Sequence, residues 1–120
     1  MIETIILNYL KEILDVPVLM ELPEVPSEDY PEFPERLVTI EKIGGSKTNF
    51  VFIASIAFQS HSTKRLHDAA ALDEEVRLAI DQMIELPEIG SVRLASNYNH
   101  TDTRTGRYRY QCVYDICYIE

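Results

Sequence analysis

The chain has 120 residues, of which 46% are hydrophobic and 26% are charged, a composition typical of a single globular domain. Its formal net charge is −9, and residues 1–35 hold nine acidic residues against one basic residue, Lys11. So acidic a chain has little general attraction for nucleic acid or for an anionic membrane surface, and we expect neither as a partner. No apolar run approaches the roughly 18 residues of a membrane-spanning helix, and the first residues lack the basic lead of a signal peptide.

Residues 2–14 are predicted to form an amphipathic helix that packs on the core. Its apolar residues recur at intervals of three and four, which gathers their side chains on one face. Pro17 ends the helix, because the residue before a proline is driven out of the α region. A short strand from Val18 to Leu22 is expected next. The apolar positions of the helix are Ile2, Ile5, Ile6, Tyr9, Leu10, Ile13 and Leu14.

Residues 23–35 read PEVPSEDYPEFPE, with four prolines and five acidic residues. Proline has no N–H group to give to a sheet, so this segment is expected to be a surface loop. It is either a plain connector or an arm that binds a partner. A strand from Arg36 to Ile43 follows, and residues 44–49, GGSKTN, are predicted to be the turn of a hairpin.

A long apolar strand from Phe50 and the helix that follows it are expected to form the centre of the core. Alternate residues from Phe50 to Phe58 form the face that should meet the helices, while the other face is milder and is a candidate for cover by another subunit. The helix is predicted to begin near Ser62 or Thr63, either of which can cap it, and to end before Pro87. Its inner stripe is Leu66, Ala69, Ala70, Val76, Ala79, Ile80, Met83 and Ile84, and its outward residues are Asp73, Glu74, Arg77, Asp81 and Glu85.

Residues 91–99 and 107–119 are predicted to be two strands joined by the polar turn TDTRTG. Val92, Leu94 and Tyr98 would share one face of the first strand. The second strand is long, so the tip of this hairpin is expected to project beyond the body. One face of the second strand carries Tyr108, Tyr110, Cys112, Tyr114, Ile116 and Tyr118.

The predicted order of elements is α-β-β-β-α-β-β, in one domain that spans residues 1–120. We expect an α+β fold of two layers, with a mainly antiparallel sheet and both helices on one face. Cys112 and Cys117 lie five residues apart in the last strand, so they point to opposite faces and cannot form a disulfide with each other.

The sequence shows no pattern that predicts catalysis or metal binding. Ser60, His61 and Ser62 are adjacent, but no nucleophile-elbow motif accompanies them. No paired-histidine spacing is present, so we expect no enzymatic activity, no metal and no cofactor. The candidate metal-ligating residues are His61, His67, Asp68, His100 and Asp102.

Two features of opposite charge stand out from an otherwise plain domain. The acidic loop contains Asp29 and Glu32, and the tip of the last hairpin contains Arg104, Arg107 and Arg109. The alternation of tyrosine and arginine near this tip is also typical of a surface that stacks nucleic-acid bases, but the acidic net charge disfavours that function. We hypothesise instead that the loop and the tip meet between neighbouring copies of the chain.

The chain resembles the small tail terminator, or tail completion, proteins of long-tailed bacteriophages and prophages. The resemblance runs over nearly the whole chain, and the last hairpin is its most specific part. It is carried by YLKEILDVPVLMELPE, YPEFPERLVTIEKIGG, FIASIAFQSHSTKRLHDAAALDEEVRLAIDQM and VRLASNYNHTDTRTGRYRYQCVYDICY.

This resemblance implies a structural virion protein that forms a ring, usually a homohexamer, on the end of the tail tube. Such a ring ends tube growth and joins the tail to the head-side neck. Its partners would be other copies of the chain, the tail tube protein and a head-side connector protein, and DNA would pass through its acidic pore. It would lie in the virion at the tail–neck junction, and in the host cytoplasm before assembly. The contact residues expected from this resemblance are Asp29, Glu32, Arg104, Arg107 and Arg109.

Two other interpretations stay open. The first is a different component of the head–tail neck, such as a head completion or stopper protein. The second belongs to another class, a small homodimeric ligand-binding or enzymatic α+β domain. An enzyme should bring polar groups together in a pocket, and the sequence shows no such group.

Overall fold

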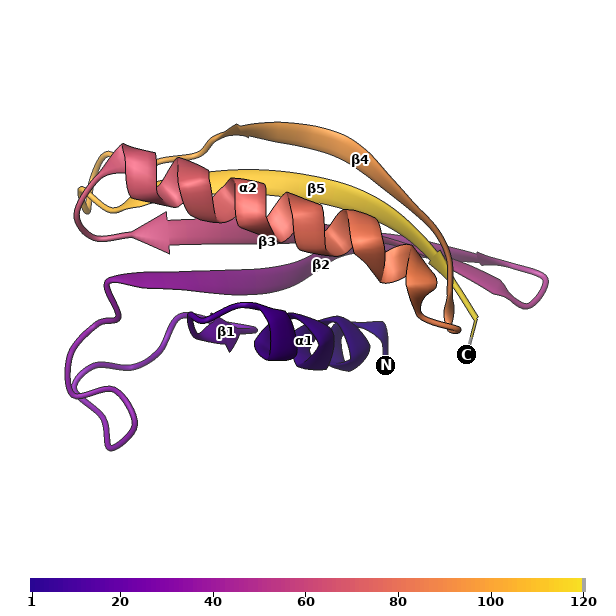
Figure 1. The fold of residues 1–120 in the computed structure, drawn as a ribbon, viewed down its shortest axis with the longest axis horizontal. Helices are drawn as coiled ribbons and strands as arrows, with labels where there is room; N and C mark the ends of the chain where they lie inside the picture. The colour runs from indigo at the N-terminus through magenta and orange to yellow at the C-terminus, as the bar shows by residue number, and fades with distance from the viewer. Residues whose placement is uncertain (120) are drawn as a thin grey trace.

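A computed structural model describes residues 1–119 and shows one mixed sheet with two helices packed on it (Figure 1). The order α-β-β-β-α-β-β is confirmed, with one turn of 3-10 helix after the second α-helix. The elements are α1 (Ile2–Ile13), β1 (Val18–Leu19), β2 (Arg36–Thr48), β3 (Val51–Ser62), α2 (Leu66–Gln82), η1 (Met83–Glu85), β4 (Ile89–Asn99) and β5 (Tyr108–Tyr118).

The five strands lie in the order β1-β2-β3-β5-β4, and every neighbouring pair is antiparallel except β1 and β2. The two-residue strand β1 is much shorter than the predicted strand Val18–Leu22, and it pairs Val18 with Val38 at one edge of the sheet. Long antiparallel strands dominate, as the sequence predicted, so the chain is a two-layer α+β fold.

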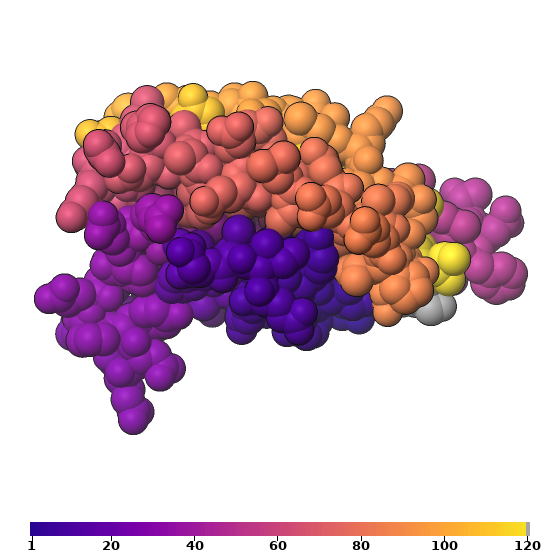
Figure 2. All heavy atoms as spheres, in the orientation of Figure 1, coloured from indigo at the N-terminus to yellow at the C-terminus, as the bar shows by residue number. Residues whose placement is uncertain are grey.

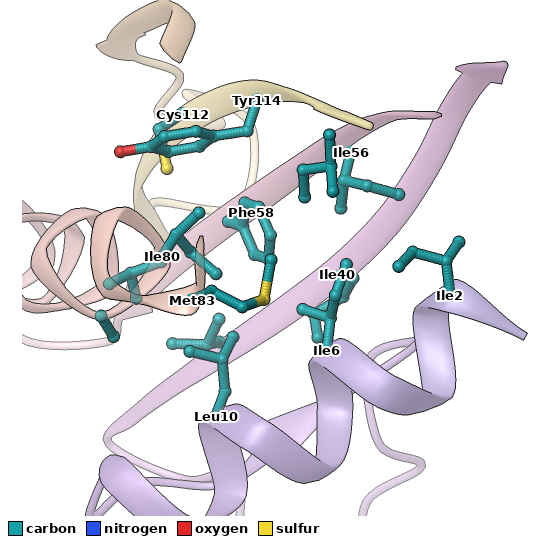
Figure 3. Packing of buried hydrophobic residues seen from close by; sticks show 14 of the residues in the cluster. Ile2, Ile6, Leu10, Ile40, Ile56, Phe58, Ile80, Met83, Cys112 and Tyr114 are labelled. Atoms are coloured by element: carbon teal, nitrogen blue, oxygen red, sulfur yellow. The ribbon is translucent and has the colours of Figure 1, made fainter. Parts of the chain in front are cut away.

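The core lies between one face of the sheet and the two helices. Figure 3 shows Ile2, Ile6 and Leu10 of α1 pointing toward Ile40 of β2 and Met83 of η1. All three α1 side chains are almost fully buried, and burial of each contributes about 1.5–3 kcal/mol. The Tyr9 hydroxyl also donates a hydrogen bond to the Ala79 carbonyl at 2.7 Å, which ties α1 to α2.

The predicted inner face of the central strand is confirmed at Ala54, Ile56 and Phe58, which are fully buried. Phe58 meets Tyr114 of β5 edge to face, with ring centroids 6.0 Å apart. The buried stripe on β5 is also confirmed at Cys112, Tyr114, Ile116 and Tyr118.

The predicted turn at residues 44–49 is wrong, because those residues continue strand β2 as far as Thr48. A bulge between Lys42 and Gly44 shifts the register of the β2–β3 pair, and pairing continues on both sides of it. At Gly45 the facing strand comes so close that an added Cβ would lie 3.2 Å from the Ile53 carbonyl oxygen. The chain reverses at Asn49, whose φ of 58° is a left-handed conformation that asparagine tolerates.

The prediction that Phe50 belongs to the core is therefore also wrong. Phe50 lies in the turn at the end of the β2–β3 hairpin and is 84% exposed. This hairpin extends past the helices at one end of the molecule, at the right of Figures 1 and 2. The longest dimension of the molecule is 44 Å.

Helix α2 starts at Leu66, later than the predicted start at Ser62 or Thr63. Ser62 is the last residue of β3, and its hydroxyl accepts hydrogen bonds from the backbone N–H groups of Lys64 and Arg65. The serine thus has the chemistry of a helix cap but stabilises the turn before the helix. Within the helix, Asp73 is buried and not outward as predicted, whereas Ile84, predicted to be inner, is 45% exposed in η1.

The prediction that Val92, Leu94 and Tyr98 share a face of β4 is wrong for Tyr98. A register shift between Leu94 and Ser96 reverses the alternation of side chains. Val92 and Leu94 therefore lie opposite Ile116 and Tyr114 on the helix side, and Tyr98 lies opposite Gln111 on the other side. The two cysteines are both free, with Cys112 buried and Cys117 half-buried.

Candidate functional site

The acidic loop, residues 23–35, and the turn between β4 and β5 lie at the same end of the molecule and contact each other. The Arg107 guanidinium lies over the Phe33 ring, 4.1 Å from its centroid, an attractive cation–π contact. Asp102 and Arg107 form an isolated β-bridge at the base of the turn. The two features of opposite charge singled out in the sequence therefore meet within one chain.

The five residues expected to make contacts are placed differently from one another. Asp29 and Glu32 are exposed in the loop. Arg104 is also exposed, with its Nε 3.9 Å from an Asp102 carboxylate oxygen, whereas Arg107 and Arg109 are half-buried against the body. The Arg109 Nε–H donates a hydrogen bond to the His100 carbonyl at 2.8 Å.

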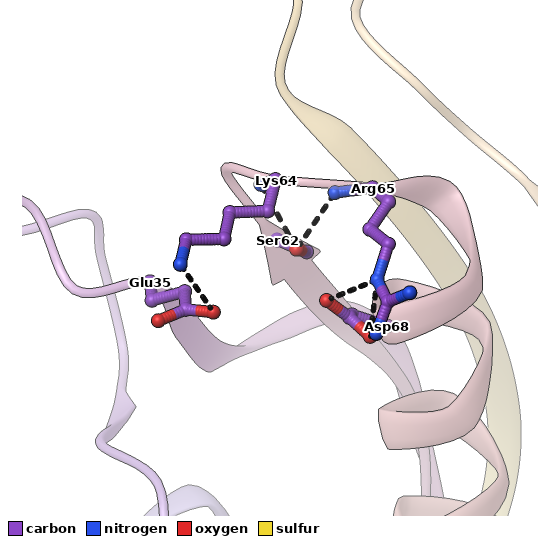
Figure 4. Close-up of polar contacts among 5 residues, drawn as sticks. All are labelled: Glu35, Ser62, Lys64, Arg65 and Asp68. Atoms are coloured by element: carbon purple, nitrogen blue, oxygen red, sulfur yellow. Dashed lines mark hydrogen bonds and ion pairs between the residues drawn. The ribbon is translucent and has the colours of Figure 1, made fainter.

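Figure 4 draws the polar contacts around the start of α2, and the contact between Lys64 and Glu35 attaches the end of the acidic loop there. Lys64 Nζ lies 3.5 Å from a Glu35 carboxylate oxygen, and the Thr63 N–H donates to the Glu35 carbonyl at 3.0 Å. Arg65 donates to both oxygens of Asp68 through its Nε–H, and this contact lowers the pKa of the Asp68 carboxyl group. The end of the acidic loop is thereby fixed where it joins β2.

The projecting end of the β2–β3 hairpin, residues 42–50, is the first of three surfaces suited to assembly. All nine residues are exposed, including Ile43 at 52% and Phe50 at 84%. The segment carries Lys42 and Lys47 and no acidic residue. It combines apolar side chains with positive charge, and Figure 2 shows it standing clear of the body.

The second surface is a groove between the outer side of α1, strand β1 and the beginning of the acidic loop. It encloses about 510 Å³, and its apolar walls include Leu7, Leu19, Met20 and Leu22. Met20 and Leu22 are 41% and 42% exposed. The charged residues of the lining are Lys11, Glu21 and Glu24. We call this surface the α1–β1 groove, and it combines apolar walls with a net negative charge.

The sheet face away from the helices is the third surface, and a row of hydrogen-bonded polar side chains crosses it. Thr39 of β2 donates to Gln59 of β3 at 2.8 Å, and Gln59 donates to Gln111 of β5 at 2.8 Å. Gln111 then donates to the hydroxyl of Tyr98 on β4. This row links four strands and gives the face a polar centre.

His61 is buried on the same face beside this row. The Thr39 hydroxyl lies 3.0 Å from His61 Nε2, and because its proton goes to Gln59, the histidine Nε2–H is the donor. Nδ1 then carries a lone pair that has no hydrogen-bond partner among residues 1–119. Burial, with Arg109 and Arg107 adding positive charge, lowers the pKa of His61 to about 4.

Farther along this face, Asp115 of β5 binds two neighbouring strands. It accepts a hydrogen bond from the Ser55 hydroxyl at 2.7 Å and from Arg93 at 3.1 Å. Both contacts lower the pKa of its carboxyl group. Next to it is a shallow hollow of about 310 Å³, which Ile53 and Cys117 also line.

Sequence reasoning missed a buried polar cluster where α2 packs on the sheet. The Asp73 carboxylate is 1% exposed and accepts hydrogen bonds from Arg77 at 3.0 Å and from Asn97 of β4 at 2.9 Å. Cys112 lies close to it, and burial, followed by the negative charge of Asp73, raises the pKa of the Cys112 thiol. A signal was present, since Arg77 follows Asp73 by four residues, but that spacing is equally common on exposed helix faces.

The structure separates the adjacent Ser60, His61 and Ser62. Alternation along β3 places Ser60 and Ser62 on the helix side, while His61 faces the polar row. In the described part of the chain no three His, Cys, Asp or Glu side chains gather to hold a metal ion. None of the helices described is long and apolar enough to cross a membrane.

Comparison with known proteins gives no assignment: no family model matches this chain, and no curated protein matches it.

Proposed function

We propose that this chain is a structural virion protein that forms a ring of six copies on the end of a phage tail tube. The ring would end growth of the tube and join the tail to the neck of the head. The sequence resembles tail terminator proteins over nearly its whole length, and this resemblance suggests the role. The protein would lie at the tail–neck junction of the virion.

The observation that carries the proposal is that so small a chain has three surfaces suited to binding another protein. A domain of 13.8 kDa has an apolar hairpin that projects from one end and an open groove beside α1. It also leaves one whole face of its sheet without a covering helix. Exposed apolar side chains that gather on one surface often mark sites of protein association, and the hairpin and the groove present such side chains, whereas the open sheet face has a polar centre.

The charge of the chain agrees with a channel for DNA. A net charge of −9 would repel phosphate groups and let DNA pass without sticking to the ring wall. The interpretation as an enzyme or ligand-binding domain has less support. The α1–β1 groove and the hollow beside Asp115 are open, and among the described residues that line them there is no paired nucleophile and base.

Addition of the purified protein to purified tail tubes of its own phage tests the proposal. Electron microscopy should show a ring at one end of each tube, and capped tubes should stop elongating when fresh tube protein is added. Tubes that stay bare and keep growing in an excess of the protein would overturn the proposal. Rings found only on head connectors would favour the alternative neck component.

A further inference from the structure

The β2–β3 hairpin tip and the α1–β1 groove have complementary chemistry. The tip presents Phe50, the most exposed of the large apolar side chains at 84%, and Ile43, 52% exposed, lies farther back on the same hairpin at the Lys42/Gly44 bulge. The groove presents Leu19, Met20 and Leu22 around a space of about 510 Å³, which is within the usual range for a binding pocket. An aromatic anchor that enters an apolar pocket is a common centre of a protein interface.

The charges of the two surfaces also match. The tip carries the base Lys47 next to the turn, while Lys42 and the exposed Glu41 lie farther back on the hairpin. The groove has Glu21 and Glu24 in its lining against the single base Lys11, and residues 12–35 contain eight acidic residues and no lysine or arginine. Opposite charges around an apolar centre would guide the tip into the groove and fix its orientation.

One chain cannot make this contact with itself. The hairpin tip extends from one end of the molecule, and the acidic loop that forms part of the groove lies at the other end (Figures 1 and 2). The long dimension that separates these ends is 44 Å. A contact between two different surfaces at opposite ends is heterologous, so each bound copy presents the same free surfaces to the next.

We propose that the hairpin tip of one copy inserts Phe50 into the α1–β1 groove of the next copy, with Lys47, which lies next to the turn, facing Glu21 and Glu24. This inference rests on the proposed function, since it names the contact that closes the ring. The repeated contact closes into a ring if its rotation allows, as the proposed function requires.

Two charge-introducing variants test the contact, one on each surface. Phe50→Asp removes the anchor and adds an acid that the acidic groove repels, while Leu22→Asp removes part of the groove wall. Leu78→Asp makes the same kind of change on the outer side of α2, where Leu78 is 60% exposed, and serves as the matched control. Phe50→Asp and Leu22→Asp should each weaken self-association at least ~30-fold, whereas Leu78→Asp should associate like the wild type.

A mixture of the two inactive variants gives the sharpest test, because each retains the surface that the other lacks. Phe50→Asp has an intact groove and Leu22→Asp has an intact tip, so sedimentation should show a 1:1 complex that grows no further. Formation of this complex also proves that both variants are folded. A symmetric contact of like surfaces would not be restored by mixing.

The outcomes separate this inference from the function on which it rests. If the wild type forms a ring and both variants still form it, the hairpin contact is wrong and the ring stands. If the wild type stays monomeric at every concentration, the contact between copies is wrong, and capping of tail tubes then decides the function independently. If the variants fail alone and combine only as a 1:1 complex, the contact is established.

Discussion

Phe50 and Phe58 are eight residues apart but lie in opposite environments. Because of this difference, we expect their substitutions to change the free energy of unfolding by very different amounts. Phe58 is fully buried against Tyr114, while Phe50 is 84% exposed at the hairpin tip. We expect Phe58→Ala to lower the free energy of unfolding by about 3–5 kcal/mol through lost burial and the cavity it leaves.

Phe50→Ala is the control for this change, because it removes the same atoms from an exposed site. Its effect on the monomer should stay within about 0.5 kcal/mol. Urea unfolding of both variants under conditions that keep the chain monomeric measures the difference. Equal effects of the two substitutions would mean that Phe50 is packed against the body and not exposed at a free hairpin tip.

His61 makes the stability of the fold depend on pH. Its pKa falls from 6.5 to about 4 on folding, so the unfolded chain binds the extra proton between these values while the folded chain does not. Stability must therefore decrease as pH falls through this window. The loss between pH 7.5 and pH 4.5 should reach about 2–3 kcal/mol from this residue.

The comparison variant is His61→Gln, which is polar and does not titrate. Unfolding by urea at pH 7.5 and pH 4.5 should show the decrease in the wild type and lack most of it in the variant. The pKa values of Asp68, Asp102 and Asp115 are lowered from 3.8, so these carboxyl groups lose their contributions only at more acid pH. The same decrease in both proteins would show that His61 is accessible to water when folded.

At the scale of elements, Asp73 attaches helix α2 to strand β4. It is the buried partner of Arg77 and Asn97. Without it, the Asn97 amide keeps only its hydrogen bond to the Gln111 carbonyl, and the Arg77 side chain, 34% exposed, is left to water. We expect Asp73→Ala to lower the free energy of unfolding by about 1–2 kcal/mol through the lost hydrogen bonds. The control is Glu74→Ala, one residue farther along on the exposed side of the helix, which should change the free energy of unfolding by less than about 0.5 kcal/mol. Thermal unfolding of both variants measures the difference between them.

The sequence predicted the type and order of these elements because the apolar periods of α1, α2, β3 and β5 are strong. The predicted ends of helices and strands were wrong where the same residues are compatible with two local structures. Ser62 can cap a helix, but its hydroxyl binds the turn that precedes α2. Residues 44–48 have turn-forming composition, yet pairing with β3 holds them in a strand.

Other features depend on contacts distant in sequence and could not be predicted from local patterns. The burial of Asp73 requires Asn97, which is 24 residues away. The face of Tyr98 is reversed by a register shift in β4. Of the residues expected to make contacts, Arg107 is placed on Phe33 of its own chain, a pairing that sequence spacing gives no means to foresee.

At the scale of the whole molecule, charge and shape act together. The acidic loop lies at one end, together with the arginines of the β4–β5 turn, and the lysine-bearing hairpin lies at the other. In the proposed contact, Lys47 of one copy would be attracted to Glu21 and Glu24 of the next. Such attraction between exposed charges is screened by salt, with a Debye length of about 10 Å at 0.1 M and about 3 Å at 1 M. We expect self-association to weaken as salt rises from 0.1 M to 1 M, and light scattering at fixed protein concentration measures this change.

Screening should leave the apolar part of the contact in place. Phe50→Asp should remove association at both salt concentrations, while Lys47→Glu should weaken it mainly at 0.1 M. Association that strengthens steadily with salt in all three proteins would indicate an interface without the proposed charge pairs.

The mass of the wild-type assembly is the first measurement to make, because both the ring and its hairpin contact depend on it. Multi-angle light scattering over a range of protein concentrations should converge on one closed species near six copies of the 13.8 kDa chain. Its mass should then stay constant as concentration rises further, since a closed ring has no free ends. A species that stays at one copy over the whole range would contradict the hairpin contact between free copies, and the capping of tail tubes would then decide whether a ring forms there.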